Sequence, residues 1–295
     1  MTNRDERGRC PISSDAARRA RADETGGAPR LDFPPGETPY VSYARMGDLL
    51  RLQHPRTSAP TEPAFIVMSQ VKELMFSLLV TEVSGAAAAL RDDRLDDAIW
   101  TLRRTIKVQQ ALIASWDVFS AMSPIEFAQF RDVLGDASGF QSVSYRRLEF
   151  ALGNKNPAMV APHRNSPSYE EVRAQLLAPS LYDEVLAYLR RRGLPIPPGV
   201  VERDPSEPYQ PHAAVEDAWR DVYADPTRHR GLYLLAEALM DVAELFARWR
   251  YTHLVVVQRV LGGKPGTGGT HGVPWLEGIS GHRFFPELWS VRSAL

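Results

Sequence analysis

The sequence predicts an all-α protein, because three observations agree. Long stretches repeat their apolar residues every three or four positions, no segment alternates apolar and polar residues as a half-buried strand does, and no internal repeat is present. A chain of 295 residues is long enough to bury a sizeable core. Helical patterns of similar character lie on both sides of the proline-rich stretch LPIPPGVVERDPSEPYQP. We therefore expect a single all-helical domain over residues 38–295.

Residues 1–37 have a different composition from the rest of the chain. They are rich in Arg, Asp, Gly and Pro, and their large apolar residues are Ile12, Leu31 and Phe33. Such a segment cannot bury enough apolar surface to offset the entropy lost on ordering. We expect residues 1–37 to be disordered and order to begin near Thr38.

The helices can be placed from the apolar period and from capping residues. The period predicts long helices over residues 65–90 and 95–122. A third helix should begin after Ser123, with Pro124 at its first position and Glu126 closing a capping box. Further helices are expected over residues 180–192, ended by Gly193, and over residues 229–261, ended by a glycine pair.

Composition narrows the class of function. The net charge of −1 argues against a broad electrostatic contact with nucleic acid or an anionic membrane. Cys10 is the single cysteine, which excludes an internal disulfide and a thiolate-rich metal site. No uninterrupted apolar run reaches the roughly 18 residues that span a bilayer, and the N-terminus lacks the apolar core of a secretory signal. We expect a soluble cytoplasmic protein with neither nucleic acid nor membrane as a partner.

A glycine-rich loop, GGKPGTGGTHGV, follows the last long helix from Gly262. A phosphate-binding loop needs Gly-Lys-Ser/Thr between a strand and a helix, whereas here Lys264 is followed by Pro265 and a helix precedes the loop. A flexible turn between helices suits this composition. A mobile lid, whose backbone N–H groups and Thr267 hydroxyl meet a ligand, suits it equally well.

His253 lies inside the long helix before that loop, among apolar residues at helical spacing. A histidine on an apolar helical face is most often a core residue. The sequence has no HExxH motif and no cluster of histidine and carboxylate at helical spacing, which argues against zinc and non-haem iron. A single histidine from a helix above an apolar pocket is also what haem requires, so the pattern permits haem without specifying it.

Three long segments carry a family likeness: FRDVLGDASGFQSVSYRRLEFALGNKNP, RWRYTHLVVVQRVLGGKPGTGGTHGV and FFPELWSVRS. They resemble the most distinctive segments of the tryptophan 2,3-dioxygenase family, within the haem-dependent aromatic oxygenase superfamily, and the likeness runs from about Thr38 to Arg292. The resemblance implies a helical bundle, b-type haem active as Fe²⁺, O₂ as co-substrate, and a homotetramer whose N-terminal segment reaches into a neighbouring subunit's site. It also implies that His253 is the proximal iron ligand and that the glycine loop closes over substrate.

The same resemblance implies substrate-binding and cofactor-binding positions. Arg131 matches the arginine that pairs with the amino-acid carboxylate, and its planar fork of donors suits a carboxylate. Thr267 matches the loop threonine near the substrate ammonium. The other matching positions are pocket residues: Phe65 against the indole, Trp116 near the proximal side, Ser138 and Gly139 near the distal pocket, and Tyr40 and Tyr43 supplied by the neighbouring chain. On spacing alone, these aromatic residues are more often core.

Two positions depart from the family pattern. Ser69 stands where the family usually has a distal histidine, and Phe127 replaces the tyrosine that assists the arginine. A serine is not a base near neutral pH, although it is small enough to hold a water or to donate a hydrogen bond to bound oxygen. Phe127 lacks the hydroxyl that would help to fix the substrate. The loss of both polar groups suggests an altered substrate or product.

These features predict a haem-dependent oxygenase that inserts oxygen from O₂ at the indole C2–C3 bond. The substrate is expected to be L-tryptophan or a tryptophan with a substituted side chain, such as β-methyl-tryptophan. The loss of the two polar groups at positions 69 and 127 slightly favours insertion of one oxygen atom, to give an oxindole in secondary metabolism. The alternatives are a conventional tryptophan 2,3-dioxygenase that forms N-formylkynurenine, a non-catalytic sensor of haem or tryptophan, and a peroxide-dependent aromatic hydroxylase.

Overall fold

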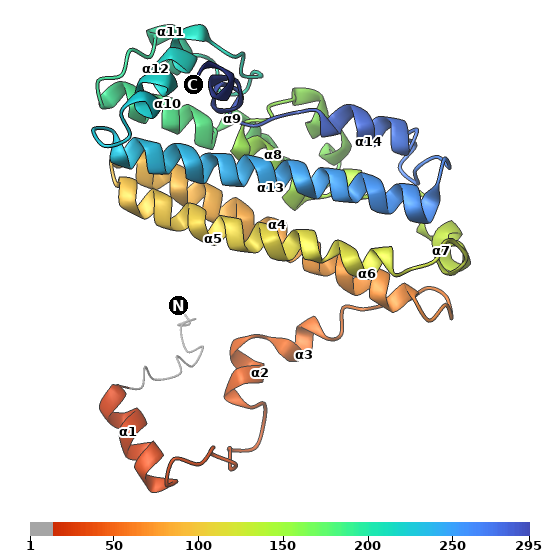
Figure 1. The fold of residues 1–295 in the computed structure, drawn as a ribbon. Helices are drawn as coiled ribbons and strands as arrows, with labels where there is room; N and C mark the ends of the chain where they lie inside the picture. Colours follow the sequence, from red (N-terminus) through yellow and green to blue (C-terminus); the bar gives the residue numbers. More distant parts are fainter. Residues whose placement is uncertain (1–13) are drawn as a thin grey trace, which may run out of the picture. The chain divides into compact units, whose positions relative to one another are not determined.

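The computed structural model describes residues 14–295, and in that range the chain forms helices and no strand, which confirms the all-α prediction. The chain divides into two compact units, residues 1–53 and residues 54–295 (Figure 1). The second unit contains the hydrophobic core and the predicted haem-ligand histidine.

The first unit contains three short helices, α1 (Asp15–Glu24), α2 (Pro39–Tyr43) and α3 (Met46–Leu49). Ser14 caps α1 by accepting a hydrogen bond from the backbone N–H of Ala17, and no residue of these helices is buried. Residues 1–13, including Cys10, lie outside the described residues. The disorder expected for residues 1–37 stays a prediction, and residues 15–24 of that segment form a helix.

Three long helices run side by side in the second unit: α4 (Glu62–Arg91), α5 (Leu95–Ala114) and α13 (Arg230–Leu261) (Figure 1). Their facing stripes bury aliphatic side chains completely, including Leu79, Leu102 and Leu239. The helices α8 (Val143–Leu152) and α10 (Leu181–Arg191) pack against α4 on its other side. The three-to-four-residue apolar period therefore marks the buried faces, as an amphipathic helix requires.

The helix predicted over residues 95–122 is broken into two. The helix α5 ends at Ala114, and α6 (Trp116–Ser120) begins after Ser115, whose hydroxyl donates a 2.6 Å hydrogen bond to the carbonyl of Leu112. Ser69 makes a similar bond inside the unbroken helix α4, so the bond accompanies the break without causing it by itself. The capping box predicted at Ser123 and Glu126 is confirmed at the start of α7 (Pro124–Arg131).

The remaining elements are short. They are α9 (Tyr169–Leu177), α11 (Pro198–Val201), α12 (Ala213–Ala224), α14 (Val273–Ser280), α15 (Pro286–Ser290), and 3-10 helices at Asp132–Leu134, Gly139–Gln141, Pro157–His163 and Val291–Ala294. The predicted helix stops are confirmed, because Gly193 after α10 and Gly262 after α13 both take a positive φ, at 87° and 63°.

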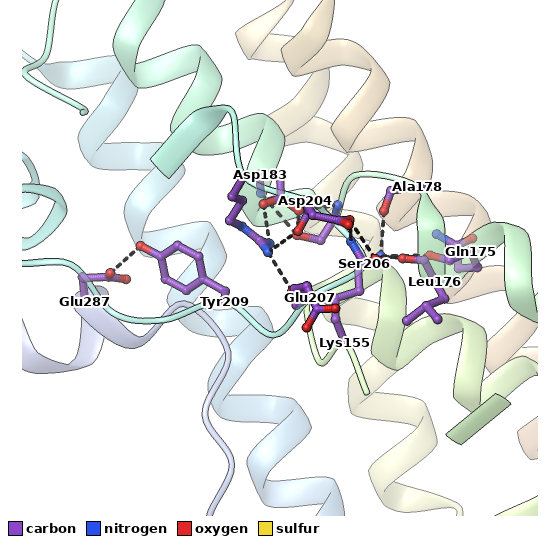
Figure 2. A network of polar contacts seen from close by, with 12 residues as sticks. Lys155, Gln175, Leu176, Ala178, Asp183, Asp204, Ser206, Glu207, Tyr209 and Glu287 are labelled. Atoms are coloured by element: carbon purple, nitrogen blue, oxygen red, sulfur yellow. Dashed lines mark hydrogen bonds and ion pairs between the residues drawn. The ribbon is translucent and has the colours of Figure 1, made fainter. Parts of the chain in front are cut away.

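Polar side chains hold the proline-rich connector between α10 and α12 against the helices (Figure 2). Arg203 pairs with Asp183 at 2.6 Å, and the hydroxyl of Tyr209 donates to the buried carboxylate of Glu287 at 2.5 Å. The buried ammonium of Lys155 donates to three carbonyls at the end of α9, those of Gln175, Leu176 and Ala178. The contacts of Arg203 and Tyr209 join the connector to α10 and α15 within one helical unit, whereas Lys155 joins the segment after α8 to the end of α9.

The helix α4 passes a test of length and composition for a membrane-crossing helix, with a mean hydropathy of 1.5 over its most apolar window. Charged residues such as Lys72 and Glu73 interrupt the apolar residues of this helix, so it has no uninterrupted apolar run of that length. The core helix of a soluble protein passes the same test. In this structure α4 packs against α5, α8 and α10, and it carries a buried lysine, Lys72.

Candidate active site

A cavity of about 290 Å³ lies in the second unit, where α4, α6, α13 and α14 approach one another. Its walls are mostly aromatic and aliphatic, as in sites that bind apolar ligands. Six residues predicted from the sequence line it: Phe65, Ser69, Trp116, Phe127, Gly139 and His253. The fold therefore brings together side chains that lie up to 188 positions apart in the chain.

His253 enters the cavity from α13 with its ring fixed by two tryptophans. Its imidazole stacks on Trp116, with ring centroids 4.6 Å apart and 11° between the planes, and it contacts Trp249 at 5.7 Å. Burial, assisted by the charge of Lys72, lowers the pKa of His253 to about 3. The imidazole is therefore neutral at physiological pH and has a nitrogen lone pair for a metal ion.

A second kind of metal site is one built from several protein side chains. Among residues 14–295 there is no group of three or more His, Cys, Asp or Glu side chains that converge as metal ligands. A site with several protein ligands is thus not available in the described chain. A cofactor that brings its own equatorial ligands, and needs one nitrogen from the protein, suits His253.

Ser69 lines the cavity, but its hydroxyl is turned toward its own helix. The Oγ atom donates a 2.7 Å hydrogen bond to the carbonyl of Phe65, one turn earlier in α4. A hydroxyl has a single proton to donate, so in this conformation Ser69 offers the cavity only acceptor lone pairs. Its predicted donation of a hydrogen bond to bound oxygen would require rotation of this side chain.

An aromatic cluster forms the wall next to Ser69. Phe65 packs against Phe119, Phe127 and Phe130, with ring centroids 5.5, 6.0 and 5.3 Å apart. Phe127 belongs to this cluster and contributes no hydroxyl. The wall is therefore suited to a flat aromatic ligand, and the packing of the rings accounts for a phenylalanine at this position.

Arg131 and Thr267 do not line the cavity and instead join two loops to each other. Arg131 Nη2 donates to the carbonyl of Pro265 at 2.7 Å, and Thr267 Oγ1 donates to the carbonyl of Ala137 at 2.6 Å. The glycine loop and the segment after α7 are thus connected by two hydrogen bonds that run in opposite directions. Arg131 Nε is buried and has no acceptor among the described residues.

Ser138 and Gly139 lie where these two loops touch. Ser138 caps the 3-10 helix Gly139–Gln141 by accepting from the N–H of Phe140 at 3.3 Å, and Gly139 lines the cavity. A Cβ atom added to Gly268 would lie 2.6 Å from the Cβ of Ser138. The loop therefore needs a glycine at this position to approach the segment so closely.

Tyr40 and Tyr43 belong to the first unit, on α2, and the structure shows them in solvent. Their exposed fractions are 69% and 92%. Both tyrosines stand on the five-residue helix α2, and residues 14–53 of their unit leave them largely uncovered.

One wall of the cavity is polar and was not predicted. The carboxylate of Glu149 accepts from Arg250 at 2.5 Å and from the Tyr145 hydroxyl at 3.0 Å, and it also pairs with Arg146. Burial and the charge of Glu149 raise the pKa of Tyr145. Two guanidinium groups share one carboxylate here, so this buried cluster has a formal charge of +1.

The structure also places Lys72 in the cavity, a residue that sequence analysis missed. Its side chain is 7% exposed, and its ammonium nitrogen has no hydrogen-bond acceptor among the described residues. Burial lowers its pKa to about 6. The sequence held a signal, because Lys72 follows Phe65 by seven positions and Ser69 by three, which puts all three on one helical face.

Comparison with known proteins agrees with this geometry. The sequence pattern of the tryptophan 2,3-dioxygenase family matches residues 24–177 and 174–295. A protein from Burkholderia multivorans named tryptophan 2,3-dioxygenase is 43% identical over 267 residues, which cover 90% of this chain and 86% of that protein. A protein of the same name from Ralstonia pickettii is 42% identical over 267 residues, covering 90% and 96%. The chain therefore belongs to the tryptophan 2,3-dioxygenase family.

Proposed function

We propose that the chain is a haem-dependent tryptophan 2,3-dioxygenase, which uses O₂ to open the indole C2–C3 bond of L-tryptophan and gives N-formylkynurenine. The family is haem-dependent and uses O₂ as co-substrate. The observation that carries the proposal is a neutral imidazole, that of His253, in the wall of an apolar cavity. The conventional reaction replaces the oxindole-forming reaction as the leading hypothesis, because relatives over 40% identical bear the dioxygenase name.

The residues present fit haem, which is a flat apolar ring with two carboxylates. The apolar walls suit the ring, and His253 offers one neutral nitrogen for the iron. The lining also contains buried N–H donors that have no acceptor among the described residues, at Lys72, Trp116, Arg146 and Trp249. Unsatisfied donors of this kind favour an occupant that brings acceptors.

His253 would hold the haem iron, and Trp116 would keep the imidazole plane in a fixed orientation by stacking on it. Bound haem in its Fe²⁺ form supplies the activation of O₂. The chain's own contribution is then to exclude water with the aromatic wall and to hold the substrate in one orientation. Haem b is the form that this site suits, because it needs no covalent attachment to cysteine.

Arg131 and Thr267 would bind the amino-acid end of the substrate. The Arg131 guanidinium has a buried Nε without an acceptor, and its Nη2 now bonds a loop carbonyl that a carboxylate can replace. The Thr267 hydroxyl bonds a backbone carbonyl on the opposite segment and can turn to accept from an ammonium. In this proposal Phe65 and Phe127 contact the indole, and Ser138 and Gly139 shape the pocket where the loop closes.

We further propose a homotetramer, in which Tyr40 and Tyr43 of one subunit complete the site of another. The exposure of both tyrosines supports a partner surface for α2. Large apolar side chains are also exposed on the long helices of the second unit: Val67, Leu74, Leu78, Trp100 and Tyr251. Light scattering after gel filtration should give four times the chain mass of 33.0 kDa. A monomer at micromolar concentration would contradict this part. Cytoplasmic location remains part of the proposal.

A second candidate is the insertion of one oxygen atom to give an oxindole, with tryptophan or β-methyl-tryptophan as substrate. Two observations favour it. The Ser69 hydroxyl is bonded to its own helix, and Phe127 has no hydroxyl, so neither side chain now donates a hydrogen bond to the indole end of the pocket. A less restrained indole ring can adopt more than one position relative to the iron.

A labelled-oxygen experiment tests the two candidates together. Haem-loaded Fe²⁺ protein would be incubated under ¹⁸O₂ with L-tryptophan and, separately, with β-methyl-tryptophan. The mass of each product would be measured by mass spectrometry. Two labelled atoms in the product of L-tryptophan would support the dioxygenase, and one labelled atom would support the oxindole reaction. Absence of product from both amino acids would overturn both reactions in favour of a sensor. Turnover with H₂O₂ alone would indicate the peroxide-dependent hydroxylase. The His253→Ala protein is the negative control.

A further inference from the structure

We propose that Lys72 is an anchor for haem, and that its ammonium group binds a carboxylate of the haem propionates. This inference rests on the proposed function, because it presupposes that haem occupies the cavity. It adds a residue that the resemblance to the family did not indicate.

The first argument is the position of the ammonium group. Its Nζ atom lies 2.9 Å from the centroid of the Trp116 ring and 3.7 Å from that of Phe119. Trp116 in turn stacks on His253. Lys72 is therefore on the lining of the same cavity as the iron-binding candidate, and not on a separate surface.

The second argument is the absence of a protein partner. Lysine is almost never buried without one, because desolvation of a cation costs several kcal/mol, of which contact with aromatic faces returns only about 0.5–2 kcal/mol. Lys72 Nζ has no acceptor among the described residues. Glu73 lines the cavity beside it and forms no ion pair with it in the described chain. A ligand that fills the cavity with an anionic acceptor would satisfy this nitrogen and favour its protonated form.

The third argument is that the neighbouring polar groups without a partner are hydrogen-bond donors. Trp116 Nε1 and Trp249 Nε1 are buried N–H groups without an acceptor in the described residues, and both line the cavity. Arg146 Nε is a further buried donor on the lining without an acceptor. All four groups can donate, so an occupant with acceptors satisfies them. Haem brings acceptors only on its two propionates, since the porphyrin nitrogens face the iron.

The two arginines that line the cavity already have a carboxylate partner. Arg146 and Arg250 both bond Glu149, and Arg250 also bonds Tyr145. These guanidinium groups have a carboxylate between them, whereas Lys72 has none. Among the lysines and arginines that line the cavity, Lys72 is thus the one that bonds no carboxylate in the described chain, whereas Arg146 and Arg250 share that of Glu149 and leave Arg146 Nε without an acceptor.

The test removes the charge on each side of the proposed pair. Haem-free wild-type protein and Lys72→Met would be titrated with haem and with haem dimethyl ester, which lacks the carboxylate charges, and affinities would be read from the absorption spectrum. Lys72→Met should weaken haem binding at least about tenfold and should weaken ester binding less than about twofold. Lys107→Met, at an exposed lysine of α5, is the matched control and should change neither affinity.

Several outcomes would overturn the inference. Equal weakening for haem and ester would mean that the lysine acts on packing or on the iron. No weakening for either would mean that the propionates bind elsewhere. The electron paramagnetic resonance spectrum of the Fe³⁺ form would also be compared between wild type and Lys72→Met. The same spectral change with haem and with the ester would mean that the amine is an iron ligand and not a partner of a propionate. Failure of the wild-type protein to bind haem would overturn the proposed function as well. Wild-type haem binding and tryptophan oxidation, together with equal haem affinity in Lys72→Met and wild type, would overturn the Lys72 anchor alone.

Discussion

The imidazole of His253 and the indole of Trp116 lie almost parallel, with their centroids 4.6 Å apart and an angle of 11° between their planes. The imidazole stands on α13 and the indole on α6, two helices that lie far apart in the sequence. Trp116 is the first residue of α6, directly after the break that follows Ala114. This stack fixes the plane of the imidazole before any ligand binds.

Replacement of His253 with alanine should abolish stable haem binding, because no other described histidine lines the cavity. The measurement is the Soret absorption after gel filtration of the haem-loaded protein. His54→Ala removes an exposed histidine and serves as the control, which should keep the wild-type spectrum. A His253→Ala protein with a normal haem spectrum would refute the assignment of the iron ligand.

Replacement of Arg131 with alanine should raise KM for tryptophan roughly tenfold or more while leaving haem affinity unchanged. A hydrogen bond to a charged group contributes about 1.5–3 kcal/mol, which corresponds to at least one order of magnitude in binding. Steady-state kinetics and a haem titration provide the two readouts. Arg103→Ala, at an exposed arginine on α5, is the control. Unchanged KM in Arg131→Ala would remove its proposed role.

Replacement of Gly268 with alanine should reduce turnover by displacing the glycine loop. The new Cβ would lie 2.6 Å from the Cβ of Ser138 and 2.8 Å from its Oγ, which is closer than packed atoms allow. Gly263→Ala is a matched control in the same loop, because its Cβ would meet nothing within 4 Å. Haem affinity should stay constant in both variants. Equal turnover in the two would show that this loop contact is not needed for the reaction.

Replacement of Ser69 with alanine should change turnover by no more than about tenfold, since the hydroxyl proton is bonded within α4 to Phe65. Removal of a hydrogen bond within one helix changes free energy by about 0.5–1.5 kcal/mol at most. The measurement is the rate of product formation at saturating tryptophan. A loss of a hundredfold would mean that Ser69 rotates during the reaction and donates to the ligand.

The haem-free protein should lose stability as the pH falls, because two buried bases have lowered pKa values. The pKa of Lys72 falls from 10.5 to about 6, and that of His253 falls from 6.5 to about 3. As the pH falls, each group is protonated in the unfolded chain at a higher pH than in the folded protein. The free energy of unfolding therefore declines from pH 10.5 to about 6 for Lys72, and from pH 6.5 to about 3 for His253.

The Lys72→Met variant isolates the contribution of Lys72 to this pH dependence from that of His253. It should stabilise the haem-free protein at pH 7 by on the order of a few kcal/mol, because a buried amine is replaced by an apolar chain of similar length. Urea unfolding at pH 7 and pH 9.5 gives the measurement, and the variant should show the smaller difference between the two. Destabilisation by Lys72→Met at pH 7 would mean that its contacts with Trp116 and Phe119 outweigh the burial of the amine.

The sequence by itself determined the helical class, the main helix limits and the family. Period and capping residues act locally, so the start of α7 at the Ser123 capping box and the end of α13 at Gly262 could be predicted without tertiary contacts. The long family segments likewise identified His253, Phe65 and Arg131 as candidates. What local rules could not predict was the break before Trp116, since the apolar period continues through it.

Only the tertiary structure decided how the polar groups are used. The Ser69 hydroxyl turns toward its own helix, Arg131 and Thr267 connect two loops, and Lys72 points into the cavity without an anion. Each outcome depends on which partner lies within about 3 Å after residues distant in the sequence have packed together. The helical period gives the face on which a side chain stands, whereas the hydrogen bonds and charges that it meets there are set by neighbouring elements.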